Sequence, residues 1–305
     1  MTLEQLRIFV AVAEREHVTR AARELHLTQS ATSAAVAALE ARYATKLFDR
    51  VGRRIALTDA GRLFLVEAKA VLVRAAAAET VLTDLAGVVR GSLVLSASQT
   101  VANYWLPAYL HRFKESYPRI EVSLSIGNTE RVAALVHDAA ADLGFVEGEI
   151  DDPTVAATCL AHDGLVLVVP AAHPWAGRQI AGRELTQARW VLREPGSGTR
   201  AIFEGALPRF GVAAGDLDVA LELPSNEAVR AAVEAGAGAT VISRLVVAGA
   251  LEAGTLAAVD IALPARAFFL LRHKERYLTR AAEALVELLP RTAQLNDHPL
   301  RQARS

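Results

Sequence analysis

The sequence changes character between residues 85 and 91. Before this point the apolar residues repeat at helical spacing, with one short extended stretch, and after it short β-rich runs alternate with helical segments. Gly87 and Gly91 mark the break itself. Because a length of 305 residues is also too great for one simple domain, the sequence predicts a helical N-terminal domain followed by a separate α/β domain.

Three helices are predicted within the first 42 residues. An apolar stripe at steps of three and four opens the first helix, and further helices are expected over residues 18–25 and 29–42. Thr28 is the expected N-cap of the third helix, because its hydroxyl can accept a bond from an amide in the first turn. Two short helices joined by a tight turn are typical of a helix-turn-helix.

The segment 46–58 is predicted to form two short extended pieces around a turn at Gly52, which is the shape of a wing. The charge balance also differs along the chain. Residues 1–90 carry 13 Lys and Arg against 10 Asp and Glu, whereas the remaining residues carry 20 against 24. The N-terminal part is therefore the candidate for contact with nucleic acid.

One face of the third helix is predicted to read DNA. At 100° per residue, Gln29, Ser30 and Ser33 share this face. A glutamine amide can pair with adenine, hydroxyls can reach base edges or phosphates, and wing arginines suit phosphate or minor-groove contacts. The predicted DNA-contacting residues are Thr28, Gln29, Ser30, Thr32, Ser33, Arg50, Arg53 and Arg54, although Thr32 falls on the opposite face of the helix, with Val36 and Leu39.

A long helix is predicted from Thr58 to Leu85. Its apolar residues repeat at steps of four and three over roughly three heptads, a spacing that favours pairing with a second copy of the same helix. A helix buried in a globular core remains the alternative. The predicted dimerisation residues are Phe64, Ala68, Val71, Ala75, Ala78, Leu82 and Leu85.

The second domain is predicted to contain βαβ units and mostly parallel sheets, with ligands at the carboxyl ends of the strands. Three strand-to-helix junctions there carry hydroxyls and free backbone amides, which favour an anion. Each junction alone could be an ordinary N-cap. Together they predict a site for a small anion, formed by Ser98, Gln99, Thr100, Asn128, Thr129, Ser197, Thr199 and Arg200.

The first 65 residues resemble the N-terminal signature of LysR-type transcription regulators, in order and without gaps, and the rest resembles the effector domain of the same family. The segments that carry the resemblance include Thr19-Arg20-Ala21-Ala22, Leu27-Thr28-Gln29-Ser30-Ala31-Thr32-Ser33, Leu47-Phe48-Asp49-Arg50 and Leu57-Thr58-Asp59-Ala60-Gly61. The resemblance implies a cytoplasmic regulator that binds an interrupted palindrome in double-stranded DNA as a homodimer or homotetramer.

The same resemblance implies a division of the chain into a winged helix-turn-helix at 1–58, a linker and dimerisation helix at 59–90, and an effector-binding domain at 91–305. This last domain is expected to have the periplasmic-binding-protein-like fold, with one lobe at 91–161 and 267–290, the other at 162–266, and the ligand between them. Segments 98–100 and 196–200 are similar to the corresponding segments of family members that control sulfur assimilation. Sulfite or sulfate is therefore the first ligand expected.

Two other functions compete with this interpretation. An enzyme is disfavoured because the chain has neither a phosphate-binding P-loop nor a Gly-x-Ser-x-Gly nucleophile elbow. The eight histidines lack paired metal spacing and Cys159 is the sole cysteine, so neither a metal nor another cofactor is expected. No apolar run of 18 residues predicts a membrane span. The second competitor is an architectural DNA-binding protein without a ligand.

Overall fold

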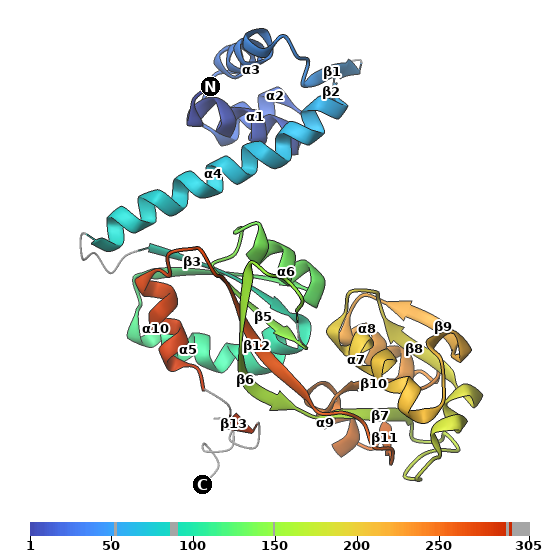
Figure 1. The fold of residues 1–305 in the computed structure, drawn as a ribbon. Coiled ribbons are helices and arrows are strands. Elements are labelled where there is room, and N and C mark those ends of the chain that lie inside the picture. Colours follow the sequence, from blue (N-terminus) through green and yellow to red (C-terminus); the bar gives the residue numbers. More distant parts are fainter. Residues whose placement is uncertain (52–53, 86–90, 149, 291–292, 295–305) are drawn as a thin grey trace. The chain divides into compact units, whose positions relative to one another are not determined.

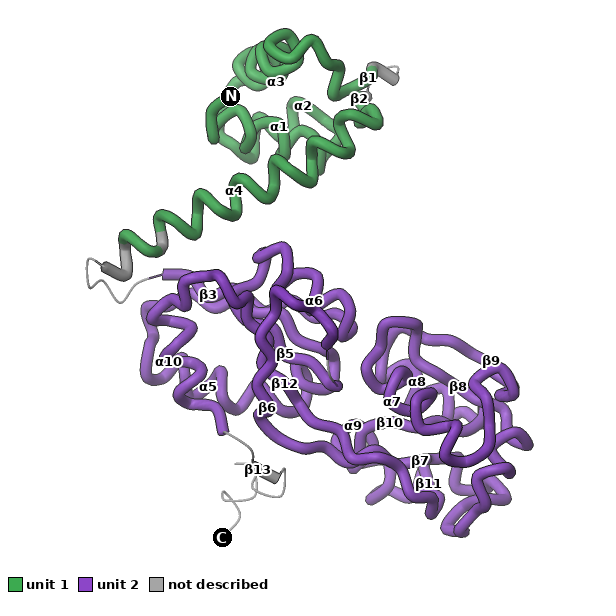
Figure 2. Tube along the Cα trace, in the orientation of Figure 1, with its two compact units in different colours: residues 1–86 green, residues 87–305 purple. Residues whose placement is uncertain are grey.

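The computed structural model describes residues 1–51, 54–85, 91–148, 150–290 and 293–294, with the backbone alone for 50, 51, 54, 80, 83–85, 293 and 294. The chain forms two compact units, Met1–Ala86 and Gly87–Ser305 (Figure 2). Among the described residues, no helix has both the length and the apolar character needed to cross a bilayer.

The first unit is a winged helix-turn-helix followed by a long helix, as predicted (Figure 1). Its helices are α1 (Leu3–Arg15), α2 (Val18–Glu24), α3 (Gln29–Tyr43) and α4 (Asp59–Leu85). Strands β1 (Phe48–Val51) and β2 (Arg54–Leu57) pair antiparallel and form the wing.

Hydroxyl caps fix where the helices of this unit begin. Thr28 Oγ1 accepts a hydrogen bond from the Ala31 amide at 3.1 Å, which confirms Thr28 as the N-cap of α3. Thr58 Oγ1 accepts from the Gly61 amide at 2.9 Å and caps α4 in the same way. Helix α4 therefore starts where the cap residue predicts it.

The core of the first unit forms where α1, α3 and the first half of α4 meet. Phe9 is fully buried, and its ring lies 5.5 Å from that of Phe48 and 4.8 Å from that of Phe64. Leu39 of α3 and Ala68 of α4 are each 1% exposed in the same cluster. The wing and α4 are thus anchored to the helix-turn-helix by shared apolar packing.

The second unit consists of two lobes. Lobe I holds a six-stranded sheet in the order β13-β6-β12-β5-β3-β4. Its strands are β3 (Gly91–Ser98), β4 (Ile120–Gly127), β5 (Leu143–Glu147), β6 (Val155–Asp163), β12 (Arg266–His273) and β13 (Ala293–Gln294). A π-helix (Val101–Trp105), α5 (Leu106–Ser116) and α10 (Arg280–Leu288) pack on one face, and α6 (Thr129–His137) packs on the other.

Lobe II contains two small sheets, ordered β10-β7-β11 and β8-β9. Their strands are β7 (Leu165–Pro170), β8 (Arg189–Arg193), β9 (Asp218–Leu223), β10 (Thr240–Ser243) and β11 (Leu256–Val259). The helices are α7 (Gly198–Ala206), α8 (Asn226–Glu234) and α9 (Arg244–Glu252), with short 3₁₀ turns at Gly182–Gln187, Leu207–Phe210 and Ala214–Asp216.

The expectation of mostly parallel sheets is wrong. Strand β12 runs antiparallel to both β5 and β6, and β7 runs antiparallel to both β10 and β11. The reason is topological, because the chain leaves lobe I after β6 and re-enters it through β12, so these two strands run in opposite directions (Figure 1). Strand β6, with the sequence VAATCLAHD, was not predicted because its alanines and polar residues lack a clear apolar alternation.

Candidate functional site

The exposed face of α3 carries the residues predicted to read bases. Gln29, Ser30 and Ser33 are all exposed, and Thr28 at the cap is exposed as well. Thr32 is a correction to the predicted set. It is fully buried, and its hydroxyl donates to the Thr28 carbonyl at 3.0 Å, so it supports the cap and cannot touch DNA.

The predicted wing arginines lie at the edge of what the structure describes. Arg50 and Arg54 belong to β1 and β2, but their side chains lie outside the described residues. Arg53 lies wholly outside them. The structure therefore places the wing backbone beside α3, and the contacts of its arginines remain a prediction.

Helix α4 presents only part of the predicted dimerisation seam. Ala68 is 1% exposed and Phe64 stacks on Phe9, so both belong to the core of their own unit and are withdrawn from the seam. Further along α4, the side chains of Val71 and Leu82 are 41% and 69% exposed. Ala78 is exposed as well, and Ala75 is half-buried. The side chain of Leu85 lies outside the described residues.

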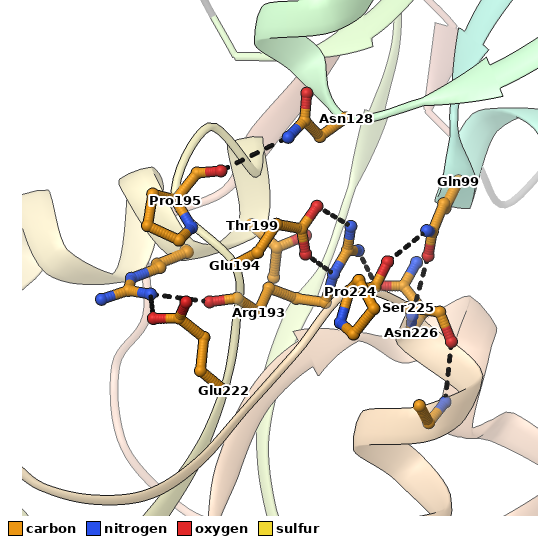
Figure 3. A network of polar contacts seen from close by, with 12 residues as sticks. Gln99, Asn128, Arg193, Glu194, Pro195, Thr199, Glu222, Pro224, Ser225 and Asn226 are labelled. Carbon is orange, nitrogen blue, oxygen red and sulfur yellow. Dashed lines mark hydrogen bonds and ion pairs between the residues drawn. The ribbon is translucent and has the colours of Figure 1, made fainter. Parts of the chain in front are cut away.

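In the second unit, hydrogen bonds join the two lobes directly (Figure 3). Gln99 of lobe I donates through Nε2 to the Pro224 carbonyl at 2.7 Å and accepts from the Asn226 amide at 2.8 Å. Asn128, at the N-cap of α6, donates to the Pro195 carbonyl at 3.3 Å. The two lobes are therefore linked by direct hydrogen bonds.

A second contact between the lobes involves Glu227 of α8. Its carboxylate accepts from Asn103 Nδ2 at 3.2 Å and from the Tyr104 hydroxyl at 3.1 Å. Burial raises the pKa of Tyr104, and the charge of Glu227 and the hydrogen bond to it raise it further. The tyrosine is thus held as a hydroxyl donor across the lobe boundary.

Arg266 is the cation at the centre of the predicted site, and the sequence analysis did not find it. Its side chain is fully buried at the start of β12. It donates to Thr199 Oγ1 of lobe II at 2.8 Å and to Thr100 Oγ1 of lobe I at 3.3 Å. Its charge is paired with Asp163, whose side chain is 2% exposed, and Glu147 lies 3.8 Å away. A basic residue directly before the apolar run 267–271 is the one sequence signal that could have revealed it.

Asn226 was missed as well. It is fully buried, and its amide side chain donates to Thr100 Oγ1 at 3.1 Å and accepts from Arg193 at 2.5 Å. The segment Pro224-Ser225-Asn226 follows a strand and opens a helix, just like the three junctions that were recognised. Applying that pattern consistently would have included it.

Arg200 is not the cation of the site, contrary to expectation. It pairs with Glu204 and Glu222 and donates to the Arg193 carbonyl at 2.9 Å, all within lobe II. Burial would lower the pKa of Arg200, but the bonds to the two carboxylates outweigh it and raise the pKa. Its charge is thus balanced within lobe II, and the guanidinium that bonds to Thr100 and Thr199 is that of Arg266.

Three buried hydroxyls have hydrogens without an acceptor among the described residues. Thr100 Oγ1 accepts from both Asn226 and Arg266, so its lone pairs are used and its hydrogen must point elsewhere. Thr199 Oγ1 accepts from Arg266 in the same manner, and Ser98 Oγ is 2% exposed with no partner. Buried donors without acceptors are costly, so the arrangement suits a ligand that supplies acceptors.

A pocket of about 470 Å³ lies between the lobes, and Thr100, Thr199 and Ser98 are not part of its wall. Thr129 and Ser197, both predicted ligand residues, contribute to its wall. The other polar side chains of the wall are the carboxylates of Glu130, Glu147, Asp151 and Asp152. An anion is therefore favoured at the hydroxyls and not in this pocket.

Gly198 sets how closely the lobes approach at this pocket. A Cβ at this position would lie 2.5 Å from the Glu147 carbonyl oxygen and 2.6 Å from Thr129 Oγ1. Any larger residue would therefore collide with lobe I. The start of α7 is in contact with the end of β5 because glycine stands there.

Comparison with known proteins covers both units. A model of the bacterial regulatory helix-turn-helix protein, lysR family, matches residues 3–62, and a model of the LysR substrate binding domain matches residues 86–294. An uncharacterized HTH-type transcriptional regulator, YeiE of Escherichia coli K12, is 35% identical over 94% of this chain and 96% of its own length. The HTH-type transcriptional regulator CbbR of Rhodospirillum rubrum is 32% identical over 95% and 96%.

Solved structures of similar proteins share the fold. Full-length CbnR complexed with its target DNA has a TM-score of 0.71 at 23% identity, over 95% of this chain and 99% of that one. The regulatory domain of CcmR from Synechocystis PCC6803, in complex with 2-PG, has a TM-score of 0.59 at 27% identity. That match covers 65% of this chain and 95% of the CcmR domain.

Proposed function

The chain belongs to the LysR family of transcription regulators, and from this membership we propose that a small anion held between the lobes of its effector domain controls its binding to DNA. Members of the family regulate transcription and are not enzymes, so the enzymatic alternative is not supported. We keep 1–58, 59–90 and 91–305 as the functional division of the chain, and the cytoplasm as its site of action because DNA is its target.

The observation that carries the proposal is the hydrogen-bonding state of Thr100. With both lone pairs occupied, its hydroxyl can only donate, and Thr199 and Ser98 add two more donors. Arg266 donates to Thr100 at 3.3 Å while its own charge is balanced by Asp163. The oxyanion proposal therefore rests on the hydroxyl donors, since an oxyanion supplies the acceptors that they lack.

The ligand-bound CcmR domain supports a small-molecule effector in this family. For this chain we propose a compact oxyanion, because the Thr100 and Thr199 hydroxyls both bond to one guanidinium. Sulfite or sulfate comes first, because segments 98–100 and 196–200 are similar to those of members that control sulfur assimilation. Such an anion would shift the balance between open and closed lobes by its difference in affinity for the two.

Calorimetric titration with sulfite, sulfate, phosphate and small carboxylates tests the ligand. Thr100→Val and Thr199→Val should each weaken the anion that binds by about 10- to 100-fold, since a hydrogen bond to a charged group contributes about 1.5–3 kcal/mol. Thr100→Ser retains the hydroxyl and should bind within about threefold of the original chain.

Unchanged anion binding in both valine variants, or binding of a bulky aromatic effector instead, would refute the anion site. A footprint on DNA that no small molecule alters would favour the architectural alternative. Either result would leave the family membership intact.

We further propose that the exposed face of α3 reads bases of an interrupted palindrome while the wing arginines hold phosphates. Gln29→Ala should reduce discrimination between the preferred duplex and single-base variants, by about 1–3 kcal/mol at one position. Arg53→Ala should weaken binding to all duplexes and lower the slope of log affinity against log salt by about one. Affinities measured over a range of salt concentrations, for the preferred duplex and for a single-base variant of it, check this prediction. Identical behaviour of Gln29→Ala and Arg53→Ala would refute the division of roles.

A further inference from the structure

The recognition helix and the wing are joined by one carboxylate. Glu40 lies in the last turns of α3, and its side chain is 11% exposed. Its Oε1 accepts from the backbone amides of Leu47 at 2.8 Å and Phe48 at 3.1 Å, and its Oε2 accepts from Lys46 Nζ at 2.9 Å. All three donors belong to the segment 46–48, which leads into the first wing strand.

The same segment is anchored on its other side by the start of α4. Thr58 donates through its amide to the Leu47 carbonyl at 3.0 Å and through its hydroxyl to the Lys46 carbonyl at 2.8 Å. A Cβ at Gly61 would lie 2.1 Å from the Leu47 carbonyl oxygen, so only glycine permits this approach. Thr58 at the start of α4 thus bonds to the carbonyls of segment 46–48, and Glu40 of α3 bonds to its amides. Glu40 therefore helps to set the position of the wing relative to α3.

We propose that Glu40 is a positioning residue for DNA recognition, which sets the wing and the Lys46 ammonium against the base-reading face of α3. A groove of about 430 Å³ separates α3 from the wing, and Ser33, Ala37, Glu40 and Lys46 line it. Apolar contacts of Val36 with Phe48 and Ile55 also join α3 to the wing, and the carboxylate bonds add a directional link at the edge of this groove.

The chemistry explains why a carboxylate stands at this place. Two converging amides and an ammonium form one concentrated donor group, and an ionised carboxylate can satisfy all of them. Partial burial alone would raise the pKa of Glu40, but the bonds from Lys46 and the two amides outweigh it and lower the pKa. Glu40 therefore stays ionised throughout the neutral pH range.

Lys46 is placed by this bond at the mouth of the groove. Its side chain is 77% exposed although its ammonium is paired, so it remains accessible to a polyanion. A DNA phosphate beside α3 would meet this ammonium. Lys46 thus becomes a DNA contact that the sequence analysis did not include.

The test measures the affinity of full-length variants for two duplexes, one selected by the original chain from a random pool and one unrelated. Glu40→Ala should weaken the selected duplex at least about tenfold and the unrelated duplex less than about threefold, since misplaced elements lose base contacts before phosphate contacts. Glu40→Gln still offers Oε1 to the amides and should lose less than Glu40→Ala. Lys46→Ala should weaken both duplexes equally and lower the salt slope by about one.

Glu24→Ala is the matched control. It also removes one negative charge from an ion pair, here with Arg15 at 2.9 Å. Among the residues that the structure describes, this carboxylate bonds to Arg15 and to no wing residue, so the ratio of the two affinities should not change. Glu40→Asp keeps the charge with a shorter reach and provides a milder variant should Glu40→Ala not fold. If the affinity ratio of the Glu40 variants matches that of Glu24→Ala, or if both duplexes weaken equally, Glu40 has no positioning role.

Discussion

Replacing Arg266 by methionine should lower the free energy of unfolding of the effector domain by about 3–5 kcal/mol, because it leaves a buried charge without its partner. Asp163 is 2% exposed and depends on Arg266 for its counter-charge. Thr100 and Thr199 would lose a donor at the same time. The three tryptophans of the chain, Trp105, Trp175 and Trp190, all lie in the second unit, so the change in their fluorescence during denaturation reports on that unit.

Two further variants test whether the loss comes from the unpaired buried charge of Asp163. Combining Arg266→Met with Asp163→Leu removes both charges and should recover most of the loss, as replacement of whole buried pairs usually does. Arg200→Met removes a more exposed pair within lobe II and should cost about 1 kcal/mol or less. A loss of under about 1 kcal/mol for Arg266→Met would show that the pair is open to water and not the buried centre of the site.

Introducing glutamate at both Val71 and Leu82 should convert the protein to monomers and weaken its binding to a palindromic duplex at least about 100-fold, because two linked heads bind far more tightly than one. Both side chains are exposed in the single chain, at 41% and 69%, on the proposed dimer seam of α4. Sedimentation measures the assembly, and titration of the duplex measures the affinity.

Ala76→Glu provides the control for this experiment. At 100° per residue, position 76 lies about 140° around the helix from Val71, away from the seam. It adds a charge to the same helix and should leave the assembly unchanged. If the double variant sediments as the original chain does, the seam does not hold the assembly together. The prediction that α4 pairs with α4 of a second copy is then wrong.

Local chemistry was the part of this fold that the sequence could predict. Spacing and capping residues identified the helix-turn-helix, the wing and the start of α4, since a cap acts within four residues of its partner. Thr32 was wrongly included among the DNA contacts because of its hydroxyl, although helical spacing already places it on the same face as Val36 and Leu39. Ala68 was assigned to the dimer seam because periodicity cannot distinguish contact with a partner from contact with α1.

The effector site could not be fully predicted from the sequence, because its residues are far apart along the chain. Thr100, Thr199 and Arg266 meet across 67 to 166 positions of sequence separation. Segment chemistry selected the two threonines as ligand residues, and the structure brings both of them to Arg266, which leaves the ligand itself a prediction. It assigned the positive charge to Arg200 because that residue is near Thr199 in sequence, whereas the antiparallel return of β12 brings Arg266 there.

The pair of strands that carries Arg266 also limits how the lobes can move. Strand β6 ends at Asp163 and β12 begins at Arg266, and these two residues are opposite each other in the ladder. The two passages of the chain between the lobes therefore leave lobe I side by side, and relative motion reduces to a swing about one axis near this ion pair. A ligand that touches Thr100, Thr199 and Arg266 acts close to that axis, whereas the rim at Gly196 and Asn128 lies further out. In such a swing, a small displacement near the ion pair would correspond to a larger one at the parts of the lobes further from it.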